Sequence, residues 1–275
     1  MKNKLNTIDL FAGCGGLMDG FQQEGHYDTL ACVEWEEEPC KTLANRLRTK
    51  WHHDNAGAEV IRFDIQRTEE LINGFDDPDY GKHVGLNSLV GRKKIDVIIG
   101  GPPCQAYSLA GRIRDEHGMK DDYRNYLFES YIRVVNHFRP RFFIFENVLG
   151  MLSAMPDGTP IVNKIRSAFD EAGYYVIKDF SDALLDVSDL GIPKHRKRVI
   201  ILGVRKDLFP EDESRSFLEH FYKKELPKHK SPERTVQEAI GDLPKIYPSK
   251  EIVKANGHKY SHTPISFETV SNHEP

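Results

Sequence analysis

Short apolar runs recur along the chain and alternate with stretches of helical periodicity. The runs are Thr7–Phe11, Leu30–Val33, Val60–Phe63, Ile95–Ile99, Phe142–Phe145, Tyr174–Ile177 and Val199–Val204. Runs this short and continuously apolar predict parallel strands that are buried on both faces of a sheet. Apolar residues at helical spacing predict helices over Cys40–Leu47, Asn125–Phe138 and Ile161–Ala172. The alternation predicts an α/β fold with a doubly wound, mostly parallel sheet.

The residues directly after five of these strands are rich in reactive and polar groups. Ligands of a doubly wound sheet bind beyond the carboxyl ends of its strands. The positions there hold, in chain order, Gly13-Cys-Gly-Gly16, Glu34, Asp64, Pro102-Pro-Cys104 and Glu146. We therefore expect one site that is assembled from five strand tips.

Length and composition fit one main domain with a smaller extension. A chain of 275 residues that is 39% hydrophobic can bury one large core. After Gly203 the sequence becomes charged and punctuated by proline, with one clear helix start at Thr235-Val-Gln-Glu238, which has capping-box spacing. We therefore expect a main domain over residues 1–205 and a connector that leads into a further region over residues 206–275.

The net charge and its distribution along the chain limit the kinds of binding partner to be expected. The net charge of −4 argues against a generic polyanion binder. Residues 1–190 hold 22 Lys and Arg against 30 Asp and Glu, whereas residues 191–260 hold 16 against 10. A basic C-terminal third on an acidic body suits a local phosphate-contacting face, and a solvated surface with a chance asymmetry is the alternative.

Localisation signals and cysteine spacing exclude several other classes. The apolar runs are far too short to span a bilayer, and the N-terminus shows no signal region, so we expect a cytoplasmic protein with no membrane segment. The four cysteines lie far apart without zinc-ligand spacing, so we expect neither a disulfide scaffold nor a metal site. Cys14, Cys32 and Cys40 are expected to be inert small hydrophobes.

The glycine-rich segment Asp9–Gly16 follows the first strand and precedes a helix, so its backbone can approach a ligand closely. Such a loop occurs in nucleotide, flavin and adenosylmethionine sites alike. Glu34 stands about twenty residues further on, where an acid accepts both hydroxyls of an unphosphorylated ribose. Asp64 at the third tip is placed to accept from an adenine amino group. Each acid alone could be a surface carboxylate, but together they indicate an adenosine site.

Cys104 follows two prolines at the end of a buried strand. Proline fixes its own φ and restricts the residue before it, so this thiol is presented on a stiff backbone rather than buried. A nucleophilic thiolate needs cationic groups or backbone donors nearby. We therefore interpret Cys104 as a nucleophile.

Glu146 follows four apolar residues, Phe142-Phe-Ile-Phe145, at the tip of a strand expected to be central. Burial there favours the protonated form of a carboxyl group, which suits a general acid, and a structural cap of a helix is the alternative. Arg196 and Arg198 precede the last strand, and alternation would send both to one side of the backbone. Their guanidinium groups could hold Glu146, a base carbonyl or a phosphate, or could form only a basic surface patch.

These segments, in this order, resemble the DNA cytosine-C5 methyltransferases. The resemblance covers roughly residues 5–205 and rests on Phe11-x-Gly-x-Gly15, Glu34-Trp35, Asp64-Ile65, Pro102-Pro-Cys-Gln105, Glu146-Asn-Val148 and Arg196-x-Arg198. Amino-group methyltransferases share the sheet but end the fourth strand with an aromatic motif instead. The resemblance implies a Rossmann-like domain over residues 1–205 that binds S-adenosyl-L-methionine, releases S-adenosyl-L-homocysteine and needs no metal.

The resemblance also implies a mechanism and its residues. A cytosine is flipped out of double-stranded DNA, Cys104 adds to C6 while Glu146 holds a proton at N3, and C5 takes the methyl group. Arg196 would support Glu146 and the base carbonyl, and Arg198 is a further catalytic candidate. Gln105 and Ser108 would touch the target strand, and the loop from Ala106 to Tyr123 would close on the DNA. The residues implied at the cofactor are Phe11, Ala12, Gly13, Gly15, Glu34, Trp35, Asp64, Ile65, Pro102 and Leu127.

Two departures from the family pattern bear on function. Lys194 stands where the family usually has Gln. The target-recognition region and the late motifs are incomplete, so we expect either a second polypeptide or a truncated chain. The resemblance implies an enzyme of a restriction-modification system, which would be nucleoid-associated if the protein is bacterial. A tRNA methyltransferase of the same chemistry, or a catalytically silent subunit that retains cofactor or partner contacts, are the alternatives.

Overall fold

The structure is a computed structural model that describes residues 4–103, 127–156, 158–244, 247–255 and 258–262, with side chains as far as Pro248. The chain forms two compact units. The first comprises Met1–Leu185 and Lys197–Lys228, and the second comprises Asp186–Arg196 and His229–Pro275. Each unit is described by itself.

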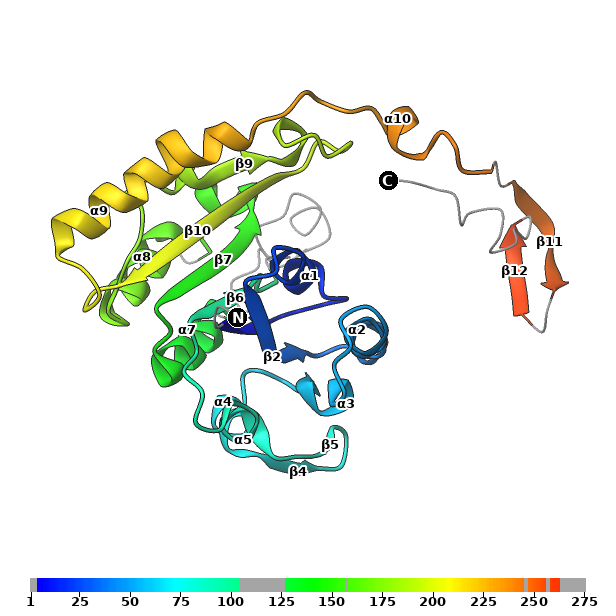
Figure 1. The fold of residues 1–275 in the computed structure, drawn as a ribbon, viewed down its shortest axis with the longest axis horizontal. Helices are drawn as coiled ribbons and strands as arrows, with labels where there is room; N and C mark the ends of the chain where they lie inside the picture. Colours follow the sequence, from blue (N-terminus) through cyan, green and yellow to red (C-terminus); the bar gives the residue numbers. More distant parts are fainter. Residues whose placement is uncertain (1–3, 104–126, 157, 245–246, 256–257, 263–275) are drawn as a thin grey trace. The chain divides into compact units, whose positions relative to one another are not determined.

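An eight-stranded sheet forms the centre of the first unit (Figure 1). Its main order is β3 (Val60–Arg62), β2 (Tyr27–Glu34), β1 (Leu5–Leu10), β6 (Val97–Gly100), β7 (Phe142–Val148), β10 (Lys197–Arg205) and β8 (Tyr174–Tyr175). The eighth strand, β9 (Leu184–Asp186), pairs with β10 outside this order. Neighbouring strands from β3 to β7 run parallel. The predicted mostly parallel, doubly wound sheet is therefore confirmed.

The last strands do not continue the parallel pattern, and that part of the expectation is wrong. β10 runs antiparallel to both β7 and β8. Parallel neighbours need a crossover connection, usually a helix. The chain between β8 and β10 offers only η3 (Phe180–Ala183), β9 (Leu184–Asp186) and η4 (Val187–Asp189). β10 therefore enters the sheet in the opposite direction.

Helices cover both faces of the sheet, as alternation along β2 shows. Cys32 packs with α1 (Gly16–Gln23), α2 (Glu37–Thr49) and α3 (Ala56–Glu59), whereas its neighbours Ala31 and Val33 pack into the larger core on the other face. That core includes α4 (Thr68–Asn73), α5 (Gly85–Val90), α7 (Leu127–Phe138) and α8 (Ile161–Glu171). Successive side chains of a strand point to opposite faces, so this strand is buried on both sides. None of the helices in the described ranges has the length and apolar character that a bilayer span requires.

The first unit continues beyond the predicted boundary at residue 205. The predicted connector instead begins with α9 (Glu211–His220) and the π-helical turn η5 (Phe221–Glu225). Leu218 and Tyr222 from these elements are buried in the core. The Tyr222 hydroxyl accepts from the Leu202 N–H at 2.7 Å and donates to the Ile200 carbonyl at 2.8 Å. The segment belongs to this unit because it completes the hydrogen bonding of β10.

A short hairpin of β4 (Phe75–Asp77) and β5 (Gly81–His83) lies between α4 and α5 in the chain. This hairpin could not be predicted from the sequence, because its strands are three residues each and read Phe-Asp-Asp and Gly-Lys-His rather than an apolar run. It packs its aromatic residues against Phe63, directly after β3.

The second unit joins two segments of the chain. The Ser231 N–H donates to the Asp189 carbonyl at 2.9 Å, and Lys230 pairs with the Asp189 carboxylate at 2.8 Å. The segment after η6 (Leu226–His229) contains α10 (Val236–Ile240) and an antiparallel pair of β11 (Pro248–Ala255) and β12 (His258–His262). Thr235 and Glu238 form the predicted capping box at the start of α10.

Candidate functional site

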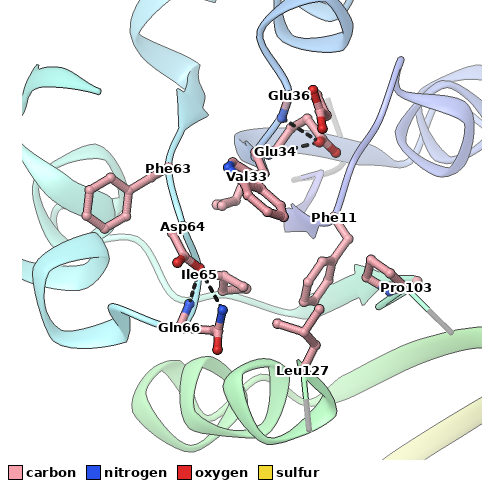
Figure 2. A pocket seen from close by; sticks show the side chains of 12 residues that line it. Phe11, Val33, Glu34, Glu36, Phe63, Asp64, Ile65, Gln66, Pro103 and Leu127 are labelled. Atoms are coloured by element: carbon pink, nitrogen blue, oxygen red, sulfur yellow. Dashed lines mark hydrogen bonds between the residues drawn. The ribbon is translucent and has the colours of Figure 1, made fainter. Parts of the chain in front are cut away.

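A cavity of about 420 Å³ opens where β1, β2, β3 and β6 end (Figure 2). It is lined by Phe11, Val33, Glu34, Trp35, Glu36, Phe63, Asp64, Ile65, Gln66, Gly101, Pro103 and Leu127. Its volume falls within the range of pockets that bind small organic ligands. The cavity lies at four of the five predicted strand tips, and Glu146, at the fifth, is not among the residues that line it.

The glycine-rich loop turns sharply after β1. Phe11 has a φ of 59°, a left-handed conformation that a bulky residue rarely adopts, and Gly15 has a φ of 87°. A β-carbon on Gly15 would approach Leu43 to 2.5 Å, so both the dihedral angle and the packing require glycine there. The turn brings the Phe11 ring to the cavity wall and begins α1 at Gly16.

Glu34 is held in place by the backbone around it. One carboxylate oxygen accepts from the Gly13 N–H at 2.7 Å. The other accepts from the N–H groups of Trp35 at 2.8 Å and Glu36 at 2.9 Å. A carboxylate has about four lone-pair sites, so the acid can still accept from a ligand hydroxyl after making these three bonds.

Asp64 forms a tight turn at the end of β3. Its Oδ1 accepts from the Gln66 backbone N–H at 3.0 Å and from the Gln66 side-chain amide at 3.4 Å. The Arg67 N–H donates to the Asp64 carbonyl at 3.1 Å. The second carboxylate oxygen is therefore available to a donor in the cavity, which Asp64 lines.

Burial gives Asp9 an unusual protonation behaviour beneath the glycine loop. The pKa of the Asp9 carboxyl is raised to about 8, mainly by burial and to a smaller extent by the nearby Glu34, against a hydrogen bond from the Met18 N–H that lowers it. That N–H, in the first turn of α1, donates to Asp9 Oδ2 at 3.2 Å. Asp9 Oδ1 is buried without a hydrogen-bond partner among the described residues. The carboxyl group therefore holds its proton at neutral pH while it caps the helix that follows the loop.

Six of the ten predicted cofactor residues line the cavity: Phe11, Glu34, Trp35, Asp64, Ile65 and Leu127. Ala12, Gly13 and Gly15 shape the loop behind it instead. Pro102 is buried and does not line the cavity, whereas its neighbours Gly101 and Pro103 do. Four further lining residues were not predicted, and each adjoins a predicted residue in the sequence: Val33, Glu36, Phe63 and Gln66.

Glu146 lies at the end of β7, beside the segment that leads to Cys104. A β-carbon on Gly101 would come within 2.6 Å of Glu146 Oε2, so the carboxylate lies directly against that glycine. The buried Asn147 side chain donates to the Pro102 carbonyl at 3.5 Å. This hydrogen bond links the end of β7 to the segment that follows β6. Cys104, Gln105 and Ser108, like the predicted closing loop, lie outside the residues that the structure describes.

The cation on Glu146 is Arg198. Its Nε lies 2.6 Å from Glu146 Oε1 across β7 and β10, and both side chains are about four-fifths buried, at 19% and 23% exposure. The N–H is not aimed at the oxygen, so the contact is an ion pair rather than an aligned hydrogen bond. The resemblance implies that Arg196 supports Glu146, but Arg196 belongs to the second unit, where its backbone N–H donates to the Asp186 carboxylate at 3.1 Å. The role of Arg196 stays a prediction.

The remaining cysteines divide into two kinds. Cys32 and Cys40 are buried, and burial raises the pKa of the Cys32 thiol well above its usual range and that of Cys40 to about 12. Burial and a raised pKa both favour the inert thiol that the sequence predicts for these two. Cys14 is exposed on the glycine loop, and its inertness stays a prediction.

Comparison with known proteins gives a consistent result. The family model for C-5 cytosine-specific DNA methylase matches residues 5–274. The Type II methyltransferase M.Bpa9945I of Bacillus paralicheniformis is 32% identical over 89% of this chain and 62% of its own length. M1.HphI of Haemophilus parahaemolyticus, another Type II methyltransferase, is 30% identical over 97% of this chain and 60% of its own length.

A solved structure agrees with these relatives. A crystal structure described as a DNA modification methyltransferase encoded within a prophage (E. coli) has a TM-score of 0.62 and 27% identity, and covers 92% of this chain and 59% of that one. This chain spans between 46% and 62% of the length of the first three curated relatives it matches. With a match across nearly all of its residues, the chain belongs to the C-5 cytosine-specific DNA methylase family.

Proposed function

We propose that this protein transfers a methyl group from S-adenosyl-L-methionine to C5 of a cytosine flipped out of double-stranded DNA. The observation that carries the proposal is the position of Gly101. It lines the cavity and also lies against the Glu146 carboxylate, so the methyl-donor site and the base site share one wall. Family membership supports DNA as the substrate.

The cavity residues fit an adenosine-containing cofactor. Glu34, fixed by three backbone N–H groups, would accept from the ribose hydroxyls, and the open oxygen of Asp64 would accept from the adenine amino group. Phe11, Ile65 and Leu127 supply apolar walls. When bound, S-adenosyl-L-methionine supplies an electrophilic methyl group. The chain's own residues orient it and shield it from water.

At the base, two described residues share one task. Glu146 holds a proton at the cytosine N3, which makes C6 more electrophilic. Arg198 pairs with Glu146 and keeps its carboxylate at the end of β7. Cys104 would attack C6 as a thiolate, so that a bond forms between sulfur and carbon and C5 becomes the nucleophile. C5 would take the methyl group as the bond from that group to the cofactor sulfur breaks, which leaves S-adenosyl-L-homocysteine. The C5 proton would then leave to solvent, its electron pair would restore the C5–C6 double bond, and the Cys104 sulfur would depart from C6 as a thiolate. Gln105, Ser108 and Arg196 would contact the target strand or the base.

A covalent trap tests the proposal. Duplex DNA with 5-fluorocytosine at the target position cannot lose its C5 substituent as a proton, so the sulfur–carbon bond to Cys104 should persist. We expect an adduct that resists denaturing electrophoresis and requires S-adenosyl-L-methionine. Cys104→Ala, and DNA with ordinary cytosine, should give none. Absence of the adduct from the unchanged protein, assayed together with its target-recognition part, would favour the silent-subunit alternative.

We further propose that the chain acts with a target-recognition part, on a second polypeptide or on a longer form of this protein, within a Type II restriction-modification system. The support is that it spans about 46% to 62% of its first relatives, which are named as Type II methyltransferases. The methyl acceptor is tested by offering labelled cofactor with duplex DNA or with tRNA. If label appeared in tRNA and not in DNA, the proposed substrate would be tRNA instead of DNA.

A further inference from the structure

Arg67 clamps the turn that carries Asp64. Its guanidinium carbon lies 4.7 Å from the centre of the Phe63 ring, a cation–π arrangement. Its Nε donates to Glu70 Oε1 at 2.8 Å. Phe63 and Asp64 both line the cavity, whereas Arg67 is not among the lining residues. The Arg67 side chain therefore supports the cavity wall through its contact with Phe63.

The β4–β5 hairpin supplies the other side of this clamp. Arg67 Nη1 donates to Asp77 Oδ2 at 2.7 Å. The other Asp77 oxygen accepts from the Asp79 N–H at 2.9 Å and the Tyr80 N–H at 3.1 Å, which fixes the hairpin turn. The Asp77 side chain is only 11% exposed, and the bonds from Arg67, Asp79 and Tyr80 lower its pKa, so it remains ionised.

Aromatic residues of the hairpin contact Phe63, which lines the cavity. The Phe75 ring stacks on Phe63 with centroids 3.9 Å apart and an angle of 16°. Tyr80 meets Phe63 edge to face at 5.1 Å. Phe63 is therefore enclosed by the hairpin and by Arg67, and is only 1% exposed. The next residue in the chain is Asp64.

We infer that Arg67 and Asp77 are positioning residues that set the selectivity of the cavity for a 6-aminopurine. By fixing Phe63 and the turn at Asp64, the ion pair of Arg67 with Asp77 holds the Asp64 carboxylate where it accepts from a 6-amino group and repels a 6-oxo group. Neither residue touches the ligand. The inference rests on the proposed function, because it assumes that the cavity binds the adenosine moiety of S-adenosyl-L-methionine.

The test compares the binding of two ligands by titration calorimetry. S-adenosyl-L-homocysteine carries the 6-amino group, and S-inosyl-L-homocysteine carries oxygen at the same position. We expect the unchanged protein to prefer the first by at least about tenfold, since a ligand group that leaves a site's polar partner unsatisfied is rejected strongly. Asp77→Asn should reduce that preference by about fivefold, mainly through weaker binding of S-adenosyl-L-homocysteine, an effect of about the size of one ordinary hydrogen bond.

The hairpin offers a matched control. Asp76→Asn makes the same chemical change one residue away, at an exposed acid that faces Lys82 at 3.4 Å, and should leave both affinities unchanged. Arg67→Lys keeps the charge but loses the planar stack on Phe63, so it should fall between Asp77→Asn and the unchanged protein. It serves as the test if Asp77→Asn does not fold.

The outcomes separate the inference from the proposal beneath it. If the unchanged protein binds neither ligand, the proposed cofactor is wrong and the inference falls with it. If it binds and discriminates, but Asp77→Asn and Arg67→Lys keep the full preference for the 6-amino ligand, the inference alone is overturned. A loss of preference in Asp77→Asn at a temperature where circular dichroism shows it folded, with Asp76→Asn unchanged, supports it.

Discussion

Glu146 and Gly101 are in contact at the tips of two adjacent parallel strands. A β-carbon on the glycine would lie 2.6 Å from Glu146 Oε2, closer than real contacts allow. Because the obstacle is the carboxylate itself, any side chain at residue 101 must move the proposed proton donor. Residue 101 is thus a glycine because the Glu146 carboxylate leaves no room for a side chain, and not because of its backbone angles.

Gly101→Ala should therefore disable the base site more than the cofactor site. We expect methyl transfer to fall by about a hundredfold or more, as for loss of a positioned general acid. The affinity for S-adenosyl-L-homocysteine should fall by less than about tenfold, since Glu34 and Asp64 are untouched. Transfer of labelled methyl groups to duplex DNA and titration of the ligand measure the two effects.

Gly57→Ala is the control for this prediction. A β-carbon on Gly57 meets nothing within 4 Å, and its φ is not in the left-handed region. It should leave transfer unchanged. Full activity in Gly101→Ala would show that Glu146 does not act from the position seen here.

Arg198→Met should slow the reaction while sparing the cofactor. The change removes the charge that lies 2.6 Å from Glu146 and keeps a long side chain. A largely buried carboxylate without its cation is poorly oriented and costs free energy, so we expect about a hundredfold slower trapping of 5-fluorocytosine DNA. Lys197→Met removes the exposed neighbouring charge and should change trapping little. Equal losses in both variants would instead indicate a shared contact with phosphate.

The strand tips could be predicted from the sequence because a parallel sheet sends its carboxyl ends to one edge. Glu34 and Asp64 each follow an apolar run, and the rule placed both at the cavity. The rule works on whole strands. It cannot tell which residue beyond a tip faces inward, since a loop has no period, and the wall is formed by Pro103 rather than Pro102.

Other features depend on contacts that no local pattern records. The partner of Glu146 is set by the antiparallel register that pairs Arg198 with Val148, which follows from the reversed direction of β10. Likewise the clamp of Arg67 on Asp77 joins a helix start to a hairpin too short and too polar to be predicted. The pairing of Glu146 with Arg198 and that of Arg67 with Asp77 could therefore be identified only from the three-dimensional structure.

Asp9 should make the protein less stable as pH rises. Its pKa is raised from 3.8 to about 8 by burial, so between these values the folded chain holds a proton that the unfolded chain releases. The stabilisation is complete below about pH 4 and is lost as pH rises to about 8, with a slope approaching about 1.4 kcal/mol per pH unit. Unfolding by urea at a series of pH values measures it.

Asp9→Asn removes the titration with little change in shape, so it should flatten the pH dependence and be the more stable protein at pH 8. Asp28→Asn is the control. Asp28 is a half-buried acid on the neighbouring strand β2 and lies 3.7 Å from Lys93, so its replacement should preserve the slope of stability against pH. A slope that survives Asp9→Asn would assign the effect to other groups.

Tyr222→Phe should destabilise the first unit without affecting the site. The hydroxyl is the partner of both the Leu202 N–H and the Ile200 carbonyl, and its loss leaves buried backbone groups unpaired, at a cost of about 1 to 3 kcal/mol. Tyr175→Phe is the control, since that hydroxyl makes one contact of 3.4 Å to Glu211 and its loss should cost less than about 0.5 kcal/mol. Urea unfolding distinguishes them. Equal stability of the two variants would mean that residues 206–228 are the connector the sequence suggested, rather than the part of the domain that closes the bonding of β10.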